Sequence, residues 1–147
     1  MICIYHQSIG PDTNPTKRLE LDNLLYSHIL TEQKQQPVIC CGDFNVPASE
    51  KDLSIKRPWG DINFSKLREV FNRFLKNSKL ADPGAQHHVF SWYPNPLKKN
   101  QMLNQGMRID YILPDMDMHT SELSTLSYIA GSDHKPVTLT AYSKNIP

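Results

Sequence analysis

The stretch Val38–Asn45 constrains the fold more than any other part of the sequence. It is a short apolar run that ends abruptly in Gly-Asp-Phe-Asn. A run of this kind, bounded by turn residues, is typical of a buried strand in a covered sheet. Such a strand places Asp43 and Asn45 at the carboxyl edge of the sheet, where open α/β sheets hold their ligands. A plain strand and turn is the alternative, since Gly, Asp and Asn are common turn formers.

The first third of the chain has the layout of a parallel crossover unit. Ile2–Tyr5 is predicted to be a strand, and a helix is expected to begin at Pro15 with Asn14 as its cap. This helix should continue to Gln33, with an apolar stripe formed by Leu21, Leu24, Leu25 and Ile29. The strand of residues 38–41 follows, and two parallel strands need such a helical connection.

The rest of the chain is predicted to contain one further helix and several strands. Asn63 or Ser65 can cap this helix, whose apolar residues recur at helical spacing: Leu67, Val70, Phe71, Phe74 and Leu75. Strands are expected over Val89–Tyr93, Met107–Leu113, Leu123–Ile129 and Val137–Tyr142. The sequence therefore predicts an α/β fold with antiparallel pairing in its later part.

Length and charge narrow the class of protein. A chain of 147 residues suits a single domain with its own core. Its formal net charge of +1 provides no bulk attraction to nucleic acid or membranes, so a polyanion would have to bind a local patch. No apolar run approaches the length of a membrane span, and the first residues lack the layout of a signal peptide. We therefore expect an intracellular protein without a membrane partner, in the nucleus or the cytoplasm.

The three cysteines match neither a disulfide framework nor a zinc-ligand spacing. This favours a reducing compartment. Cys40 and Cys41 are neighbours on one predicted strand, so they are expected to face opposite sides of the sheet.

Three sets of polar residues lie within or next to predicted strands. Asp43 and Asn45 follow a strand, Asp110 lies within a strand, and Asp133 and His134 precede the last strand. Carboxylates that converge at a sheet edge suit Mg²⁺, which prefers oxygen ligands. A carboxylate can also orient a histidine or activate water. Together these groups favour metal-assisted hydrolysis of a phosphate ester.

Each set also has a structural alternative. Asp110 could form an ion pair with Arg108, because residues two apart on a strand face the same side. Asp133 and His134 could form an ordinary turn in which the aspartate caps its own backbone.

Four ordered motifs resemble the exonuclease–endonuclease–phosphatase superfamily, and within it the exonuclease III type of apurinic/apyrimidinic endonuclease. They are Cys41-Gly-Asp43-Phe-Asn45-Val, Phe90-Ser-Trp92, Met107-Arg-Ile-Asp110-Tyr and Gly131-Ser-Asp133-His134-Lys-Pro-Val. The Asp52-Leu53 pair after the first motif and Tyr5 in the first strand also fit.

The resemblance implies a hydrolase that depends on Mg²⁺ or Mn²⁺ and cuts DNA beside abasic sites in base excision repair. Asp43 would activate the attacking water, and Asn45 would hold water and phosphate. His134 would bind a phosphate oxygen, oriented by Asp110. Asp133 would belong to the metal site.

The same resemblance implies substrate contacts for four further residues. Tyr5 would contact the phosphate, while Trp92 and Met107 would wall a pocket for a flipped abasic sugar. Core packing is the alternative for these two. Arg108 is a candidate for substrate binding. The Lys98-Lys99 loop could contact backbone phosphates or be a solvated surface.

The match covers only the C-terminal half of the fold, so residues 1–147 are expected to be the C-terminal portion of the domain. The implied fold class is half of a four-layer α/β sandwich, a mixed sheet with flanking helices that is incomplete as a domain. The other half would supply a metal-binding glutamate and an asparagine. A half sandwich exposes an apolar sheet face, so we expect the chain to bind the missing half or to self-associate. The residues after Tyr5, His6-Gln7-Ser8, also depart from the family pattern.

Two other functions remain open at this point. The chain could be a catalytically incomplete remnant or a partner subunit that binds nucleic acid or protein. It could also be another member of the superfamily, such as a retrotransposon endonuclease, a deadenylase or a phosphoinositide phosphatase.

Overall fold

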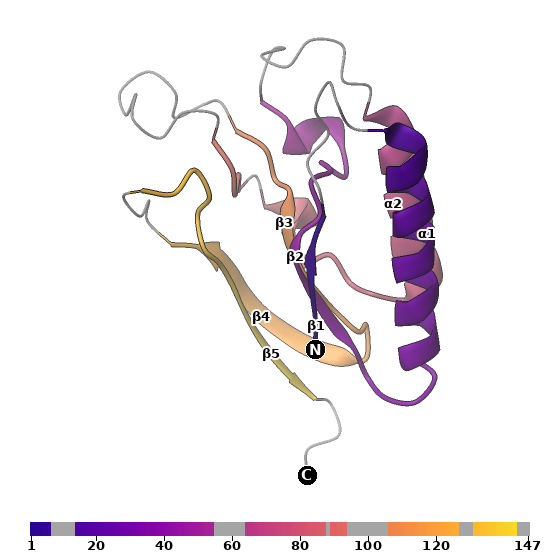
Figure 1. The fold of residues 1–147 in the computed structure, drawn as a ribbon. Coiled ribbons are helices and arrows are strands. Elements are labelled where there is room, and N and C mark those ends of the chain that lie inside the picture. Colours follow the sequence, from indigo (N-terminus) through magenta and orange to yellow (C-terminus); the bar gives the residue numbers. More distant parts are fainter. Residues whose placement is uncertain (7–13, 55–63, 88, 94–105, 127–130, 144–147) are drawn as a thin grey trace.

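A computed structural model describes residues 1–6, 14–54, 64–87, 89–93, 106–126 and 131–143. Five strands, two α-helices and two short 3₁₀ helices make up this part of the chain (Figure 1). In chain order they are β1 (Ile2–Tyr5), α1 (Pro15–Glu32), β2 (Ile39–Asp43), η1 (Glu50–Asp52), α2 (Ser65–Ser78), η2 (Pro83–Gln86), β3 (Asp110–Pro114), β4 (Met118–Thr125) and β5 (Val137–Ser143).

The central sheet is mixed and has the strand order β1-β2-β3. β1 runs parallel to β2, and their register places Tyr5 beside Asp43. β2 and β3 are antiparallel, and their register places Asp43 beside Asp110. A separate antiparallel pair, β4-β5, carries a register shift between Ser121 and Leu123. The predicted α/β fold, a mixed sheet with flanking helices, is confirmed.

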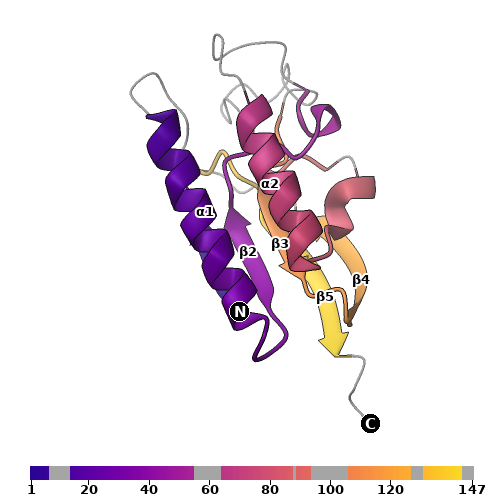
Figure 2. The same cartoon turned by 90° about the vertical axis from the view of Figure 1, so that its right-hand side faces the viewer.

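The elements form layers around this sheet. Both helices lie side by side on one face of it, and the β4-β5 pair lies on the opposite side (Figures 1 and 2). β5 contacts β3, an edge strand of the central sheet, so the β4-β5 pair packs against that edge. At the β1 edge, Cys3 is exposed and Tyr5 is 81% exposed. Neither α1 nor α2 is long and apolar enough to cross a membrane.

Helix α1 begins as predicted but buries only part of the predicted apolar stripe. The Asn14 side chain accepts hydrogen bonds from the backbone N–H groups of Thr16 and Lys17, at 3.0 and 3.4 Å. The predicted apolar stripe is confirmed in part: Ile29 is buried and Leu25 packs against the core, whereas Leu21 and Leu24 are 57% and 69% exposed. The residues that α1 buries fully are Arg18, Asp22, Tyr26 and Ile29. These are spaced i, i+4, i+8 and i+11, so they share one face.

Helix α2 buries the predicted stripe. Leu67, Val70, Phe71 and Phe74 are buried, and Leu75 packs against the same cluster. Its cap was predicted wrongly at Ser65, which is the first helical residue; Phe64 occupies the cap position without a side-chain hydrogen bond. Asn63 lies outside the described residues. The helix ends at Ser78, and the cap residue Lys79 has a left-handed φ of 53°.

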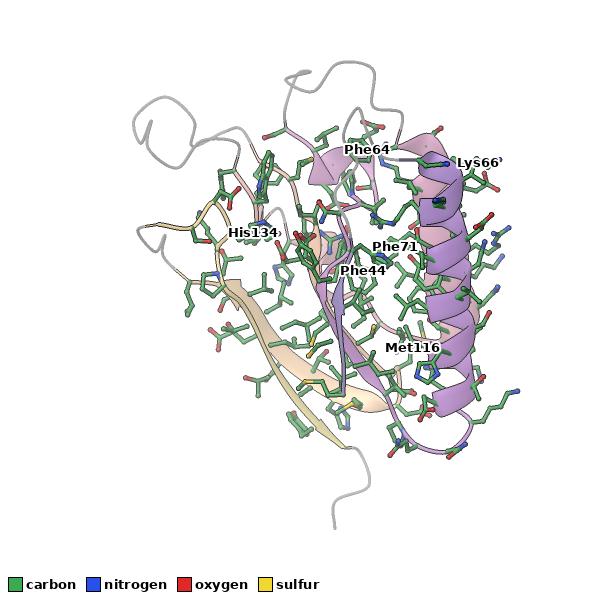
Figure 3. All side chains as sticks on the ribbon, viewed as in Figure 1. Phe44, Phe64, Lys66, Phe71, Met116 and His134 are labelled. Carbon is green, nitrogen blue, oxygen red and sulfur yellow. The ribbon has the colours of Figure 1, made fainter. Side chains whose placement is uncertain are left out.

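Phe44 sits at the centre of the core between the sheet and the helices (Figure 3). Its ring lies 5.2 Å from that of Phe71 and 5.5 Å from that of Tyr111, the latter edge-on. The Tyr111 hydroxyl donates to the Val46 carbonyl at 2.8 Å and accepts from the Ala48 N–H at 2.9 Å. The segment that follows β2 is therefore fixed by both apolar packing and hydrogen bonds.

Two strand predictions need correction, and a third is confirmed in part. Val89–Tyr93 is not a strand in the described part of the chain; only Trp92 forms isolated bridges, to Met107 and His134. The predicted strand at Met107 begins at Asp110 instead, because residues 107–109 bond to this irregular segment and to the turn after β2. The expected strand Leu123–Ile129 overlaps the end of β4, and residues 127–129 lie outside the described part.

The core between sheet and helices should carry most of the stability. Leu113→Ala empties a fully buried position on β3 and should lower the free energy of unfolding by about 2–5 kcal/mol. The same substitution at the exposed Leu24 should change it by less than about 0.5 kcal/mol. Urea denaturation of both variants measures the difference, and equal losses would contradict this assignment of the core.

Candidate catalytic site at the sheet edge

Asp43 and Asn45 lie where β2 ends, on either side of the core residue Phe44. Because strand side chains alternate, burying Phe44 under the helices directs Asp43 to the opposite face. Asn45 then turns the chain with a φ of 48°, a left-handed conformation that asparagine tolerates better than most residues. The sequence thus makes a strand that ends in two oriented polar side chains.

Asn45 holds the Asp43 carboxylate from two directions. Its backbone N–H donates to one carboxylate oxygen and its side-chain amide donates to the other, both at 2.8 Å. The same amide also donates to the His6 carbonyl at 2.6 Å. Burial raises the pKa of Asp43 to about 6, opposed by the backbone hydrogen bond from Asn45 and assisted by the nearby charge of Asp110. Asp43 therefore titrates close to neutrality, as a general base requires.

Asp110 and His134 form the second pair of the site. The His134 Nδ1 lies 2.9 Å from an Asp110 carboxylate oxygen. This hydrogen bond raises the pKa of His134, burial opposes the shift, and the negative charges of Asp110, Asp43 and Asp133 add to it. Asp110 is itself positioned by Ser91, whose buried hydroxyl accepts a hydrogen bond from the Asp110 backbone N–H at 3.1 Å. The pair therefore places an imidazole whose protonated form is favoured near the Asp43 carboxylate.

Asp43, Asp110 and His134 come together from three distant parts of the sequence. One ligand atom from each lies within 4.8 Å of the others. Figure 3 shows His134 on the side of the sheet away from the helices, whereas Phe44 and Phe71 lie on the helix side. Carboxylate oxygens at this spacing fit a hard divalent cation such as Mg²⁺ or Mn²⁺, which takes one or two carboxylates and keeps several waters.

Asp133 lies next to this group but has a different partner. One of its carboxylate oxygens accepts a hydrogen bond from the Trp92 indole N–H at 2.8 Å, and its carbonyl accepts from the Tyr93 N–H at 2.9 Å. The residue is exposed. Asp133 and His134 are therefore more than an isolated turn, because backbone and side-chain hydrogen bonds tie it to the Trp92 segment and it brings an exposed acid to the site.

Trp92 and Met107 are paired through their backbones, and Trp92 also bridges to His134. Each donates a backbone hydrogen bond to the carbonyl of the other, at 3.0 and 2.9 Å. Met107 is buried and packs with Ile109 in a small cluster that Trp92 and Leu53 border. This geometry is compatible with core packing and with a pocket wall, so both interpretations of the sequence stay open.

Tyr5 lies at the same edge without reaching the cluster through a described contact. It is the register neighbour of Asp43 at the end of β1, and its side chain is 81% exposed. The loop with Lys98 and Lys99 lies outside the described residues.

Arg108 has a different environment from the one predicted. Its guanidinium donates to both carboxylate oxygens of Asp52 and of Asp82, at 2.6 to 3.2 Å, and the residue is 5% exposed. It also stacks over the Tyr111 ring at 4.6 Å. A strand ion pair with Asp110 does not form among these contacts. These contacts link Asp52 of η1, the cap residue Asp82 of η2 and Tyr111 of β3 through one buried side chain. They favour a structural role for Arg108 over the predicted substrate contact.

A buried polar group beneath the site was not predicted. Arg18 donates to the Phe44 carbonyl and, at 2.8 Å, to Asp22, and His6 lies 3.2 Å from the same aspartate. The His6 backbone N–H donates to the Asp43 carbonyl at 2.8 Å. Burial and the charge of Arg18 lower the pKa of His6 to about 4, so His6 is neutral. The spacing of Arg18 and Asp22, one helical turn apart, was the available signal.

The amino-acid sequence is similar to a known protein family and to curated proteins. The profile of the Endonuclease/Exonuclease/phosphatase family matches residues 7–134. The chain is 34% identical over 135 residues to an exodeoxyribonuclease of Bacillus subtilis (strain 168), covering 83% of this chain and 51% of that protein. It is 30% identical over 142 residues to a DNA-(apurinic or apyrimidinic site) endonuclease of Arabidopsis thaliana, covering 75% of this chain and 38% of that protein.

Solved structures share the fold. A variant of the 3′ phosphatase NExo from Neisseria, bound to product DNA hairpin, superposes with a TM-score of 0.77 at 21% identity, over 94% of this chain and 59% of that one. An AP endonuclease from Archaeoglobus fulgidus gives a TM-score of 0.74 at 18% identity, over 97% of this chain and 60% of that one. The chain thus spans about half the length of the first curated relative and about three fifths of these structures.

The Asp110–His134 pair can be tested by its effect on the pKa of His134. Asp110→Asn removes the carboxylate that accepts the hydrogen bond, so the pKa of His134 should fall. Because the folded pKa is raised, the pair's contribution to stability is complete below the unfolded value of about 6.5 and is lost as the pH rises through the folded value. Wild type should therefore exceed Asp110→Asn in stability by more at about pH 6 than at about pH 9.

Histidine NMR signals followed against pH give the pKa, and urea denaturation at the two pH values gives the stability. The exposed Asp117 provides the control, since Asp117→Asn should change neither quantity. An unchanged His134 pKa in Asp110→Asn would show that the pair does not form.

Proposed function

Because the chain belongs to the Endonuclease/Exonuclease/phosphatase family, we propose that it carries out, or contributes the C-terminal part of, metal-dependent phosphodiester hydrolysis in DNA next to abasic sites. One observation carries this proposal: Asp43, Asp110 and His134 converge at the carboxyl edge of β2 with ligand atoms within 4.8 Å of one another. This hydrolysis requires a general base, a positive charge beside the phosphate, and oxygen atoms that can bind a metal ion.

Asp43 acts on the attacking water in this proposal. With its pKa raised to about 6, the carboxyl group is mostly ionised at neutral pH yet still basic enough to accept a proton. Asn45 fixes both carboxylate oxygens, so the base is held in one orientation. The side-chain amide N–H groups of Asn45 donate to Asp43 and His6, so its side-chain oxygen is the candidate for accepting a hydrogen bond from a water that donates in turn to the phosphate.

His134 binds a phosphate oxygen in this proposal. Its pKa is raised, which favours the protonated ring near neutrality, and its Nδ1 is engaged by Asp110. The second ring nitrogen, Nε2, is then the atom that donates to the phosphate. Asp110 acts as a positioning residue, because it fixes the ring orientation and stabilises its positive charge.

A divalent cation would supply the positive charge that stabilises the transition state of the phosphate. Asp133 is the proposed metal ligand, and its carboxylate is exposed next to the cluster while Trp92 orients it. Mg²⁺ and Mn²⁺ fit this oxygen-rich set equally well.

Substrate contacts are proposed for the residues around the cluster. Tyr5 would contact the phosphate, and its exposure beside Asp43 supports this role. Trp92 and Met107 would wall the sugar pocket, which an abasic nucleotide could enter without a base. The partner is thus DNA with abasic sites. Arg108 is kept out of this set, because its donors are used by Asp52 and Asp82.

The similarity to an exodeoxyribonuclease favours a second candidate, removal of nucleotides from DNA ends. The same cluster would serve this reaction, since both reactions hydrolyse phosphate esters. A third candidate is a part that binds DNA or a protein without turnover, which the partial span of the relatives supports.

Incision of a duplex with one abasic analogue tests the proposal. We expect cleavage beside the analogue with Mg²⁺, none with a chelator, and a loss of about 10²–10⁴-fold in Asp43→Asn. A matched duplex with an ordinary base and a recessed 3′ end separates endonuclease from exonuclease activity.

Asp117→Asn is the matched control, because the residue is exposed and outside the cluster. Equal rates for wild type and Asp43→Asn would refute the role of Asp43. Binding of the abasic duplex without cleavage by any variant would favour the non-catalytic alternative.

A further inference from the structure

Two thiols face each other across β1 and β2. Cys3 and Cys41 are register partners on these parallel strands, and their sulfur atoms lie 3.6 Å apart. Neighbouring strands are about 4.8 Å apart, within the range of Cα separations that a disulfide spans. Side-chain rotation alone could therefore bring the two sulfur atoms to bonding distance.

The third cysteine is separated from this pair by the sheet itself. Cys40 precedes Cys41, so it points to the opposite face, where it is fully buried in the core under the helices. Cys3 is exposed and Cys41 is half-buried. The chain thus carries two facing thiols, one of them exposed, and a third thiol that is buried on the other face of the sheet.

The environments of the two thiols indicate an order of reaction. Cys41 is half-buried and its sulfur lies 3.6 Å from that of Cys3, so an external reagent reaches Cys41 less readily. Cys3 is the exposed member of the pair, so an external reagent reaches it first. Burial raises the pKa of Cys40 to about 12, which protects it further.

We propose that Cys3 and Cys41 form a redox-active dithiol site that low-molecular-weight disulfides, such as oxidised glutathione, convert into an intramolecular disulfide. This proposal is independent of the proposed function. It rests on the 3.6 Å separation, the register pairing and the unequal exposure of the two side chains.

The reaction balances in two exchange steps. The Cys3 thiolate attacks one sulfur of the external disulfide, whose S–S bond breaks and releases one thiolate. The Cys41 thiol then loses its proton and attacks the Cys3 sulfur of the mixed disulfide, releasing the second thiolate. Two protein thiols are oxidised, one external disulfide is reduced to two thiols, and the reverse exchange with excess thiol restores the dithiol.

The disulfide would link β1, an edge strand of the sheet, covalently to β2. Tyr5 and Asp43 lie two residues further along β1 and β2 and are the next register pair on the same face. A covalent link at Cys3 and Cys41 would hold the ends of both strands together beside the candidate catalytic site.

Mass spectrometry after incubation with oxidised glutathione tests the proposal on the full chain. Wild type should lose two hydrogen atoms and retain no glutathione, and peptide mapping should find a Cys3–Cys41 bond. Cys41→Ser should stop at a stable glutathione adduct on Cys3. In Cys3→Ser, modification should slow by about 10-fold or more, because only the shielded thiols remain.

Cys40→Ser is the control and should still form the disulfide. If this variant fails to fold, the peptide map of wild type carries the same information, since it identifies which cysteines are joined. A retained adduct in wild type, a bond that includes Cys40, or disulfide-linked dimers would each overturn the proposal.

Discussion

The antiparallel pairing of β2 with β3 is the constraint on which the site depends. It sets Asp43 opposite Asp110 at the edge of the sheet, although the two residues are far apart in the sequence. Phe44 secures this arrangement, because its burial between the sheet and the helices fixes which face Asp43 occupies. A slip of one residue would exchange the two faces and bury the carboxylate in the aromatic core.

This arrangement concentrates like charges in a partly buried place. Burial makes Asp43 harder to ionise, and the charge of Asp110 adds to the effect. His134 offsets part of this cost as a neighbouring cation, and a bound divalent cation would offset more. Clusters of acids with perturbed pKa values cost stability, and they are most common where chemistry is performed. The site therefore lies next to an aromatic core, which is formed by Phe44, Phe71 and Tyr111.

Sequence reasoning found the parts of this molecule that local patterns determine. The strand ending at Asp43, the apolar face of α2, and the polar sets at Asp43, Asp110 and His134 all follow from runs, periods and motifs. It failed where long-range contacts decide. The buried face of α1 is set by Arg18, which bonds to the Phe44 carbonyl, and not by the number of leucines. Arg108 pairs with Asp52 and Asp82 because η1 and η2 bring them close, which no spacing reveals. Val89–Tyr93 has strand-forming residues, but among the described residues it forms only bridges.

The central claim is that this sheet edge is a divalent-metal site for phosphodiester hydrolysis, and metal binding tests it without requiring turnover. Titration with Mn²⁺, followed by paramagnetic broadening of backbone amide NMR signals, reports which residues lie near the ion. Early broadening is expected at Asp43, Asp110, Asp133 and His134, with none at Lys79 at the far end of α2, and excess Mg²⁺ should reverse it. Broadening that is absent from the cluster, or that persists in Asp43→Asn/Asp133→Asn, would contradict it.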